Sequence, residues 1–174
     1  MLSPKLHAAI NEQINAELWS AYLYLSMSLD AENKGLKGVA NWFYGQWLEE
    51  QDHARILMNY LWSRDCKVEL KPIAEVRTQW NSVLEMYQET LKHERVVTGL
   101  INNLAAIAME DRDFASSNML VWFVNEQVEE EESARDMIFA VESVEGDKYG
   151  MYQLDKELAA RTYTQASPLA ASAE

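Results

Sequence analysis

Apolar residues recur at three- and four-residue steps along most of the chain, and this spacing predicts four long helices. Ser3-Pro4 fits an N-cap followed by proline at the first helical position, so the first helix should begin there. We expect the long helices over residues 4–32, 36–63, 82–110 and 114–141, and a short fifth helix over 151–161. The predicted fold class is therefore all-α.

The connections between these helices predict the topology. Asn33-Lys34-Gly35 and Asp111-Arg112-Asp113 are tight turns, so each joins two neighbouring antiparallel helices. Residues 64–81 have no helical period and contain Pro72. About 18 extended residues are enough to follow the roughly 42 Å of a 28-residue helix. The order short, long, short predicts a four-helix bundle with one long crossover and a short C-terminal fifth helix.

Length and composition favour a single domain. The chain has 174 residues, is 48% hydrophobic, and contains only 6 Gly and 3 Pro, so it is long enough for one sizeable core and has few breakers. We expect residues 1–163 to form the bundle with its fifth helix. Residues 164–174, which are rich in Ala and Ser, should be a mobile tail.

The charge balance limits the partners. With 15 basic and 28 acidic residues the net charge is -13, which repels phosphate backbones and anionic lipid surfaces and attracts cations. We therefore expect no nucleic acid and no membrane as partner. Cys66 is the only cysteine, and Met1-Leu2-Ser3-Pro4 lacks the features of a signal peptide. Both observations favour a cytoplasmic protein.

The first predicted helix carries more apolar surface than one core stripe needs. From Leu18 to Leu29 the apolar residues extend nearly all the way round the helix. This pattern fits either a thick core with exposed aromatics or a subunit interface. We favour the interface, since a large exposed apolar patch usually marks one, and it predicts a homo-oligomer.

One carboxylate interrupts the apolar stripe of each long helix. These residues lie near the middle of the helices, at matching distances from the two tight turns: Glu17, Glu50, Glu94 and Glu130. Burying four ionised carboxylates without compensation would cost more than the net stability of a domain. No Lys or Arg occupies the same stripes at that level. Carboxylates together with one imidazole are ligands for iron or manganese, so a metal site is predicted.

Glu50-x-x-His53 is the most suggestive motif of this set. The two side chains share one helix face, so the carboxylate can bridge two metals while the imidazole holds one. Alone, such a short motif is common on solvated helix faces. Together with Glu17, Glu94 and Gln127-x-x-Glu130 it predicts a dinuclear site. Tyr24 lies two turns from Glu17 on the same helix face. Tyr24 and Trp122 are either ordinary core residues or neighbours of that site.

The same residues carry a resemblance to the non-haem bacterial ferritins, over roughly residues 3–161. It rests on the order and spacing of four stretches: Asn11-Glu12-Gln13 with Glu17-Leu18, Glu49-Glu50-x-x-His53, Lys92-His93-Glu94, and Glu126-Gln127-x-Glu129-Glu130. The chain lacks the second Glu-x-x-His of bacterioferritins and rubrerythrins. Gln51 stands where bacterioferritins have a haem-ligating Met, so no haem is expected.

The resemblance implies a set of iron ligands. One iron would be held by Glu17, Glu50 and His53, and the second by Glu50, Glu94 and Glu130 with Gln127 close by. A third iron site would use Glu49, Glu126 and Glu129 and share Glu130, although these residues also fit a solvated acidic face. Tyr24 would have a redox role. The catalytic set is thus Glu17, Glu50, His53, Glu94, Gln127, Glu130 and Tyr24.

The resemblance also implies an activity and an assembly. It predicts a ferroxidase that oxidises Fe(II) to Fe(III) with O₂ or peroxide and stores a ferric mineral inside a hollow shell of 24 subunits, with the fifth helix at fourfold contacts. The iron entry route stays open, because Ser116, Ser117 and Asn118 stand where animal ferritins have acidic pore residues. Two other classes remain as alternatives: a dinuclear-iron oxygenase or reductase of an organic substrate, and a metal-free helical interaction protein.

Overall fold

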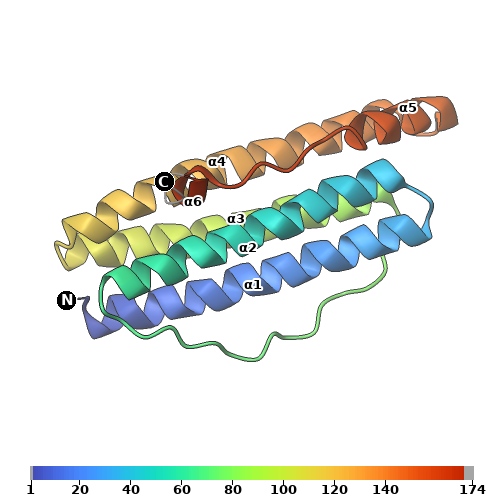
Figure 1. The fold of residues 1–174 in the computed structure, drawn as a ribbon. Helices are drawn as coiled ribbons and strands as arrows, with labels where there is room; N and C mark the ends of the chain where they lie inside the picture. Colours follow the sequence, from blue (N-terminus) through green and yellow to red (C-terminus); the bar gives the residue numbers. More distant parts are fainter. Residues whose placement is uncertain (1, 171–174) are drawn as a thin grey trace.

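Four long helices form an elongated bundle, and two shorter helices follow at the C-terminal end of the described chain (Figure 1). The computed structural model describes residues 2–170. Its helices are α1 (Pro4–Asn33), α2 (Lys37–Ser63), α3 (Val83–Glu110), α4 (Phe114–Ser143), α5 (Lys148–Leu158) and α6 (Ser167–Ala170). The all-α prediction is confirmed, and the long helices lie within two residues of the predicted bounds.

Side-chain caps explain where the long helices begin. Ser3 Oγ accepts a hydrogen bond from Leu6 N at 3.1 Å, which satisfies one of the free amide groups of the first turn. Ser82 Oγ does the same for Glu85 N at 3.0 Å at the start of α3. The turn between α1 and α2 contains Gly35 at φ 78°, a conformation that favours glycine. Local sequence therefore explains where α1 and α3 begin and where the first hairpin turns.

The crossover between α2 and α3 runs along α1 in an extended path (Figure 1). Polar side chains of α1 hold its backbone: Asn11 Oδ1 accepts from Glu69 N, and Asn15 Oδ1 accepts from Lys71 N, both at 2.7 Å. These bonds satisfy backbone groups of a segment that has no ladder of its own. The predicted single long crossover is confirmed.

The hydrophobic core consists of two clusters. On α1 the buried members of the first cluster end at Ile14, and those of the second begin at Leu23. Glu17 is buried between these two positions. The same division recurs on α2, where Phe43 belongs to one cluster and Leu57 to the other. The polar centre thus lies between two apolar layers that exclude water from both sides.

The fifth helix begins three residues earlier than predicted and ends three residues earlier. Asp147 caps it by accepting a hydrogen bond from Tyr149 N at 2.9 Å, so Gly150 lies inside the helix. The helix packs against α2, where Asp155 Oδ1 accepts from Gly38 N at 2.9 Å. A Cβ at Gly38 would lie 1.6 Å from the Asp155 carbonyl oxygen, so only glycine allows this contact.

The chain after α5 turns back along the bundle beside α2 and α4 (Figure 1). Tyr163 Oη donates a hydrogen bond to Asp52 on α2, and Ala166 N donates to the same carboxylate at 3.0 Å. Leu169 is buried in the core cluster that contains Leu6 and Leu57. Residues 164–170 of the predicted tail therefore contact the bundle, and their mobility stays a prediction. Residues 171–174 lie outside the described part of the chain.

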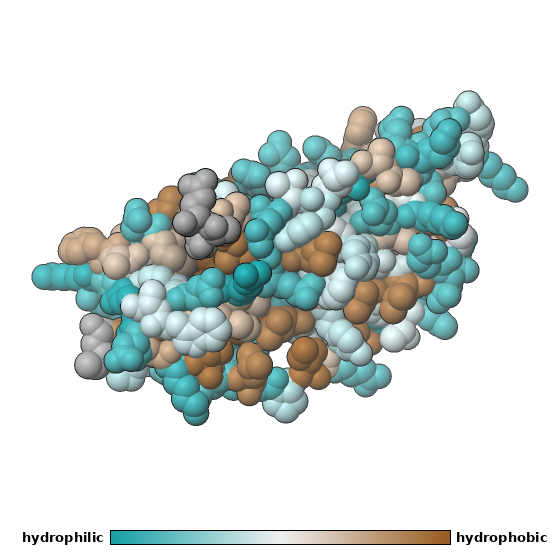
Figure 2. Space-filling model, in the orientation of Figure 1, coloured by the Kyte–Doolittle hydropathy of each residue, from teal (hydrophilic) through white to brown (hydrophobic). Residues whose placement is uncertain are grey.

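Apolar side chains also gather on the outer surface of the bundle (Figure 2). On α1, Tyr22 is 50% exposed and Leu29 is 57% exposed, although both belong to the apolar stretch 18–29. One face of that stretch packs into the core and the other faces outward. Among residues 2–170, no helix is both long enough and apolar enough to cross a membrane.

Candidate metal centre

Each long helix brings one carboxylate into the middle of the bundle. Glu17, Glu50 and Glu94 are each 1% exposed, and Glu130 is 7% exposed. They come from α1, α2, α3 and α4 in that order. Each lies on the stripe that also carries buried apolar residues, so packing of the four helices places all four carboxylates inside.

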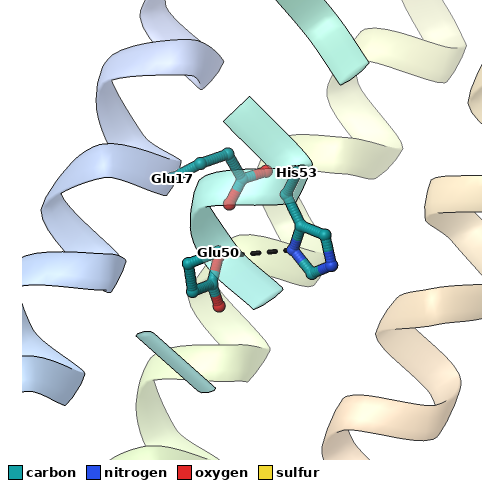
Figure 3. A group of neighbouring side chains, drawn as sticks. All are labelled: Glu17, Glu50 and His53. Carbon is teal, nitrogen blue, oxygen red and sulfur yellow. Dashed lines mark ion pairs between the residues drawn. The ribbon is translucent and has the colours of Figure 1, made fainter. Parts of the chain in front are cut away.

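A first cluster joins α1 and α2 and contains Glu17, Glu50 and His53 (Figure 3). One ligand atom from each lies within 4.8 Å of the others, and His53 Nδ1 is 3.3 Å from Glu50 Oε2. Gln13 Nε2 donates to Glu17 Oε1 at 2.9 Å. Glu17 Oε2 and Glu50 Oε2 are buried and accept no hydrogen bond, although Glu50 Oε2 faces His53 Nδ1. Such oxygens are costly to bury, and a cation fits them.

A second cluster shares the same imidazole. His53, Glu126 and Glu130 also place ligand atoms within 4.8 Å of one another, with His53 Nε2 3.9 Å from Glu126 Oε1. The two ring nitrogens of His53 therefore face two different carboxylate groups. The Glu126 side chain is 26% exposed, whereas His53 is 2% exposed, so this cluster leads from the buried centre toward the surface.

Glu94 is turned toward donors on α1 and α4. Its Oε1 accepts a hydrogen bond from Tyr24 Oη, and its Oε2 accepts from Gln127 Nε2 at 3.2 Å. Within residues 2–170, the three-ligand groups are the two clusters above, and Glu94 belongs to neither. The second set implied by the resemblance, Glu50 with Glu94 and Glu130, is thus not gathered around one point. The two donors satisfy Glu94 and hold it outside both clusters.

Burial perturbs the acidity of the whole centre. Because a buried carboxylate loses its hydration when it ionises, burial raises the pKa of Glu50 and Glu130 well above the ordinary value. The pKa of Glu17 is also raised for this reason. Burial alone would lower the pKa of His53. Interactions with Glu126 and Glu50 outweigh it and raise that pKa well above its usual range. A set of strongly perturbed pKa values in one place is typical of functional sites.

Comparison with known proteins places this arrangement in a family. Residues 7–143 match the ferritin-like domain. A bacterial non-heme ferritin of Bacteroides fragilis is 40% identical over 161 residues, which is 92% of this chain and 100% of the relative. The bacterial non-heme ferritin of Staphylococcus aureus is 34% identical over 165 residues, covering 95% and 99% of the two chains. The chain belongs to the ferritin family.

Solved structures agree with this assignment. An open pore ferritin from the archaeon Archaeoglobus fulgidus superposes with a TM-score of 0.92 at 42% identity, covering 93% of this chain and all of the other. A humanized archaeal ferritin gives a TM-score of 0.93 at 41% identity, covering 94% of this chain and 99% of the other. The resemblance found in the sequence motifs and the predicted ferritin-like fold are both confirmed.

The residues expected at a third iron site of this ferritin are only partly together. Glu126 and Glu130 meet at His53. Both carboxylate oxygens of Glu49 accept hydrogen bonds from Arg161 Nη2, at 2.9 and 3.0 Å. Glu129 is exposed on α4 and belongs to neither cluster. Glu49 is thus paired with a cation of the chain itself.

Sequence reasoning missed three residues that contact the expected ligands: Gln13, Gln46 and Arg161. Gln13 and Gln46 each lie four residues before a ligand, on the same helix face, and this spacing was a usable signal. Gln46 Nε2 donates to Glu130 Oε2 at 2.8 Å, across to another helix. Arg161 follows the fifth helix and has no periodic pattern around it, so nothing in the sequence pointed to it.

Proposed function

We propose that this protein oxidises Fe(II) to Fe(III) at the carboxylate centre and stores the product. The carrying observation is the pair of buried oxygens on Glu17 and Glu50, beside His53, that no hydrogen bond satisfies. Hard oxygen ligands with one imidazole suit iron, and burial keeps them from water. Membership of the ferritin family also supports iron as the bound ion.

Two irons are proposed to bind between the helices. The first takes Glu17, Glu50 and His53, which already lie together. The second takes Glu50, Glu94 and Glu130, and for this Glu94 exchanges its hydrogen bonds to Tyr24 and Gln127 for the metal. Gln127 stays beside the site, because its Nε2 also donates to the Glu94 backbone carbonyl oxygen at 3.3 Å. Each Fe(II) gives up one electron; O₂ accepts the two with two protons to form H₂O₂, or H₂O₂ accepts them with two protons to form two waters.

A third iron is proposed to bind nearer the surface. Its ligands are Glu126 and Glu130, joined by Glu49 and Glu129. The exposed part of the Glu126 side chain and the exposed Glu129 support a path for ions between the centre and the surface. The net charge of -13 favours cation passage in general.

Storage requires an enclosed space, which one bundle does not have. We propose a hollow homo-oligomer of 24 subunits that resides in the cytoplasm and contacts neither membrane nor nucleic acid. The half-exposed Tyr22 and Leu29 on α1 support subunit contacts on that face, because closed symmetric assembly buries such surface. The exposed tyrosines of α5, Tyr149 and Tyr152, support further contacts at that end.

A single titration tests this proposal. Metal-free protein is mixed with Fe(II) in air in increasing ratio, ferric absorbance is followed, and particle mass and iron content are measured by analytical ultracentrifugation. We expect oxidation faster than in buffer and a large particle that carries far more iron than its binding sites hold. A monomer, or oxidation no faster than in buffer, would contradict the proposal.

A further inference from the structure

Arg161 connects the chain after α5 to the metal centre. It lies three residues beyond the end of α5, and its guanidinium group rests against α2. Nη1 donates to the Trp42 carbonyl oxygen at 2.9 Å, and Nη2 donates to Gln46 Oε1 at 2.8 Å and to both oxygens of Glu49. Its Cζ lies 5.1 Å from the centroid of the Trp42 ring. A planar fork of donors suits such a divided set of acceptors.

No other lysine or arginine in residues 2–170 forms an ion pair with an expected iron ligand. Arg95 on α3 and Arg135 on α4 both pair with Glu131, which is not in the ligand set. The contact of Arg161 with Glu49 is therefore specific to the centre.

Arg161 also determines how Gln46 faces Glu130. A guanidinium group can only donate, so the amide oxygen of Gln46 must turn toward Arg161 and its NH₂ group must turn away. Gln46 Nε2 then donates to Glu130 Oε2 at 2.8 Å. Gln46 is 1% exposed, so no water competes freely for either end of the amide. The Arg161 side chain thus acts on Glu49 directly and on Glu130 through the Gln46 amide.

The anchor of Arg161 does not depend on those carboxylates. The Trp42 carbonyl and ring hold the guanidinium group from the side of α2. Gly45 leaves room for it, because a Cβ there would lie 3.1 Å from Nη1. The chain carries Arg161 to this place through α5, whose Asp155 is fixed at the start of α2. The guanidinium group is therefore a fixed point against which the carboxylates are aligned.

We propose that Arg161 is a positioning residue of the metal centre, fixing Glu49 directly and Glu130 through Gln46. The inference rests on the proposed function, since it assigns a role toward the ion bound there. Partners that orient metal ligands typically contribute 10- to 100-fold to metal affinity. Without Arg161 nothing fixes the Gln46 amide oxygen, so the NH₂ group is held toward Glu130 less firmly.

The test measures binding of Co(II), which occupies oxygen and imidazole sites without the oxidation chemistry of iron. Isothermal titration gives affinity and stoichiometry, and the visible absorption of bound Co(II) reports ligand geometry. We expect Arg161→Gln to weaken Co(II) binding about tenfold or more and to change the spectrum. Gln46→Leu, which removes only the link to Glu130, should weaken binding by a smaller factor. Because Gln46 transmits the effect of Arg161 to Glu130, the double variant Arg161→Gln with Gln46→Leu should bind Co(II) no more weakly than Arg161→Gln alone.

Two variants separate positioning from other effects. Arg161→Lys keeps the charge but loses the second nitrogen donor, so it should recover little of the affinity. Tyr163→Phe removes the neighbouring anchor to Asp52 and leaves Arg161 in place, so it should bind Co(II) like the wild type. Circular dichroism checks the helical content of all variants, and Gln46→Leu carries the test if Arg161→Gln fails to fold.

Several results would overturn the inference. Unchanged or tighter binding in Arg161→Gln would show that Arg161 is neutral or competes with the metal. Full recovery in Arg161→Lys would reduce its effect to charge. An equal loss in Tyr163→Phe would assign the effect to docking of the whole segment. If the proposed function itself is wrong, the failure looks different: wild type and Glu50→Ala then bind Co(II) alike.

Discussion

The phenol of Tyr24 on α1 donates a hydrogen bond to Glu94 Oε1 on α3, across the buried centre of the bundle. Tyr87 on α3 stands in contrast, because its hydroxyl is buried and has no hydrogen-bond partner. Both rings pack against Phe43, at centroid distances of 6.2 and 5.0 Å. One aromatic layer thus contains a tyrosine bound to an expected ligand and a matched tyrosine that is not.

This contrast gives the first prediction. Tyr24→Phe should slow the initial oxidation of Fe(II) about three- to tenfold, because Glu94 loses the donor that holds it beside the site. The redox role implied for Tyr24 also predicts a tyrosyl radical signal in the rapidly frozen wild type and none in Tyr24→Phe. Tyr87→Phe is the control and should change neither. Equal behaviour of the two variants in stopped-flow and paramagnetic resonance experiments would remove Tyr24 from the centre.

The second prediction concerns the outer carboxylates Glu126 and Glu129. Replacing both by Ala should leave the first fast oxidation intact, since the ligands Glu17, Glu50 and His53 are all retained. It should alter the number of Fe(II) ions oxidised per subunit and slow later additions. Stopped-flow titration with successive Fe(II) additions measures both quantities. Wild-type stoichiometry and recovery in the double variant would reduce these residues to a solvated acidic face.

A third prediction follows from the buried charge of Glu17. Burial raises its pKa above the ordinary value, so the folded state binds a proton more tightly than the unfolded chain does. Protonation of Glu17 therefore contributes to the free energy of unfolding. This contribution is complete below about pH 4 and is lost as the pH rises through the pKa of the folded state. Metal-free Glu17→Gln should therefore be more stable than the wild type at pH 7, by on the order of 1 kcal/mol, with a smaller difference at pH 4.

Denaturant unfolding followed by circular dichroism checks this expectation. Glu32→Gln, at an exposed position on the same helix, is the matched control and should change stability little at either pH. A loss of stability in Glu17→Gln at pH 7 would mean that the carboxylate is stabilising without metal.

The fourth prediction uses the ion pair that joins the end of α2 to the start of α4. Arg64 Nη2 lies 2.7 Å from Asp113 Oδ2, and this partner, together with the amide of Ser116, lowers the pKa of Asp113 to about 2. The ion pair therefore stabilises the folded state at pH values above about 3.9, the pKa of an Asp in the unfolded chain. This stabilisation is lost as the pH falls through about 2. Because both side chains retain some exposure, we expect Arg64→Gln to cost only about 1 kcal/mol at neutral pH.

The pH dependence provides its own check. The difference in unfolding free energy between Arg64→Gln and the wild type should shrink between pH 4 and pH 2. Arg77→Gln removes a more exposed arginine from the crossover and should cost less at every pH. A constant difference across this range would show that Arg64 acts through packing rather than through Asp113.

The helices and the buried carboxylates were predictable because they depend on local periodicity. Glu17, Glu50, Glu94 and Glu130 each interrupt an apolar stripe, and a stripe is buried whenever the bundle forms. The tight turns and the extended crossover fixed the topology in the same way. Burial of these side chains follows from spacing that can be counted along the chain.

Contacts that join distant segments were not predictable in this way. Arg161 reaches Glu49 across 112 positions of sequence, and no repeat or motif marks it. The start of the fifth helix was missed because the predicted range began after Gly150, a residue that disfavours helix, whereas the Asp147 cap and the contact of Asp155 with α2 stabilise the helix through it. The side-chain rotation of Glu94 toward Tyr24 likewise depends on which donors the fold brings near it.

The central claim is that Glu17, Glu50 and His53 hold the iron that is oxidised, and stopped-flow oxidation of Fe(II) in Glu50→Ala and His53→Ala tests it most directly. Metal-free wild type and variants are mixed with two Fe(II) per subunit in air-saturated buffer, and ferric absorbance is followed. We expect the fast phase to vanish in both variants while helical content by circular dichroism is retained. Wild-type initial rates in both would contradict the account, because the centre would then lie elsewhere.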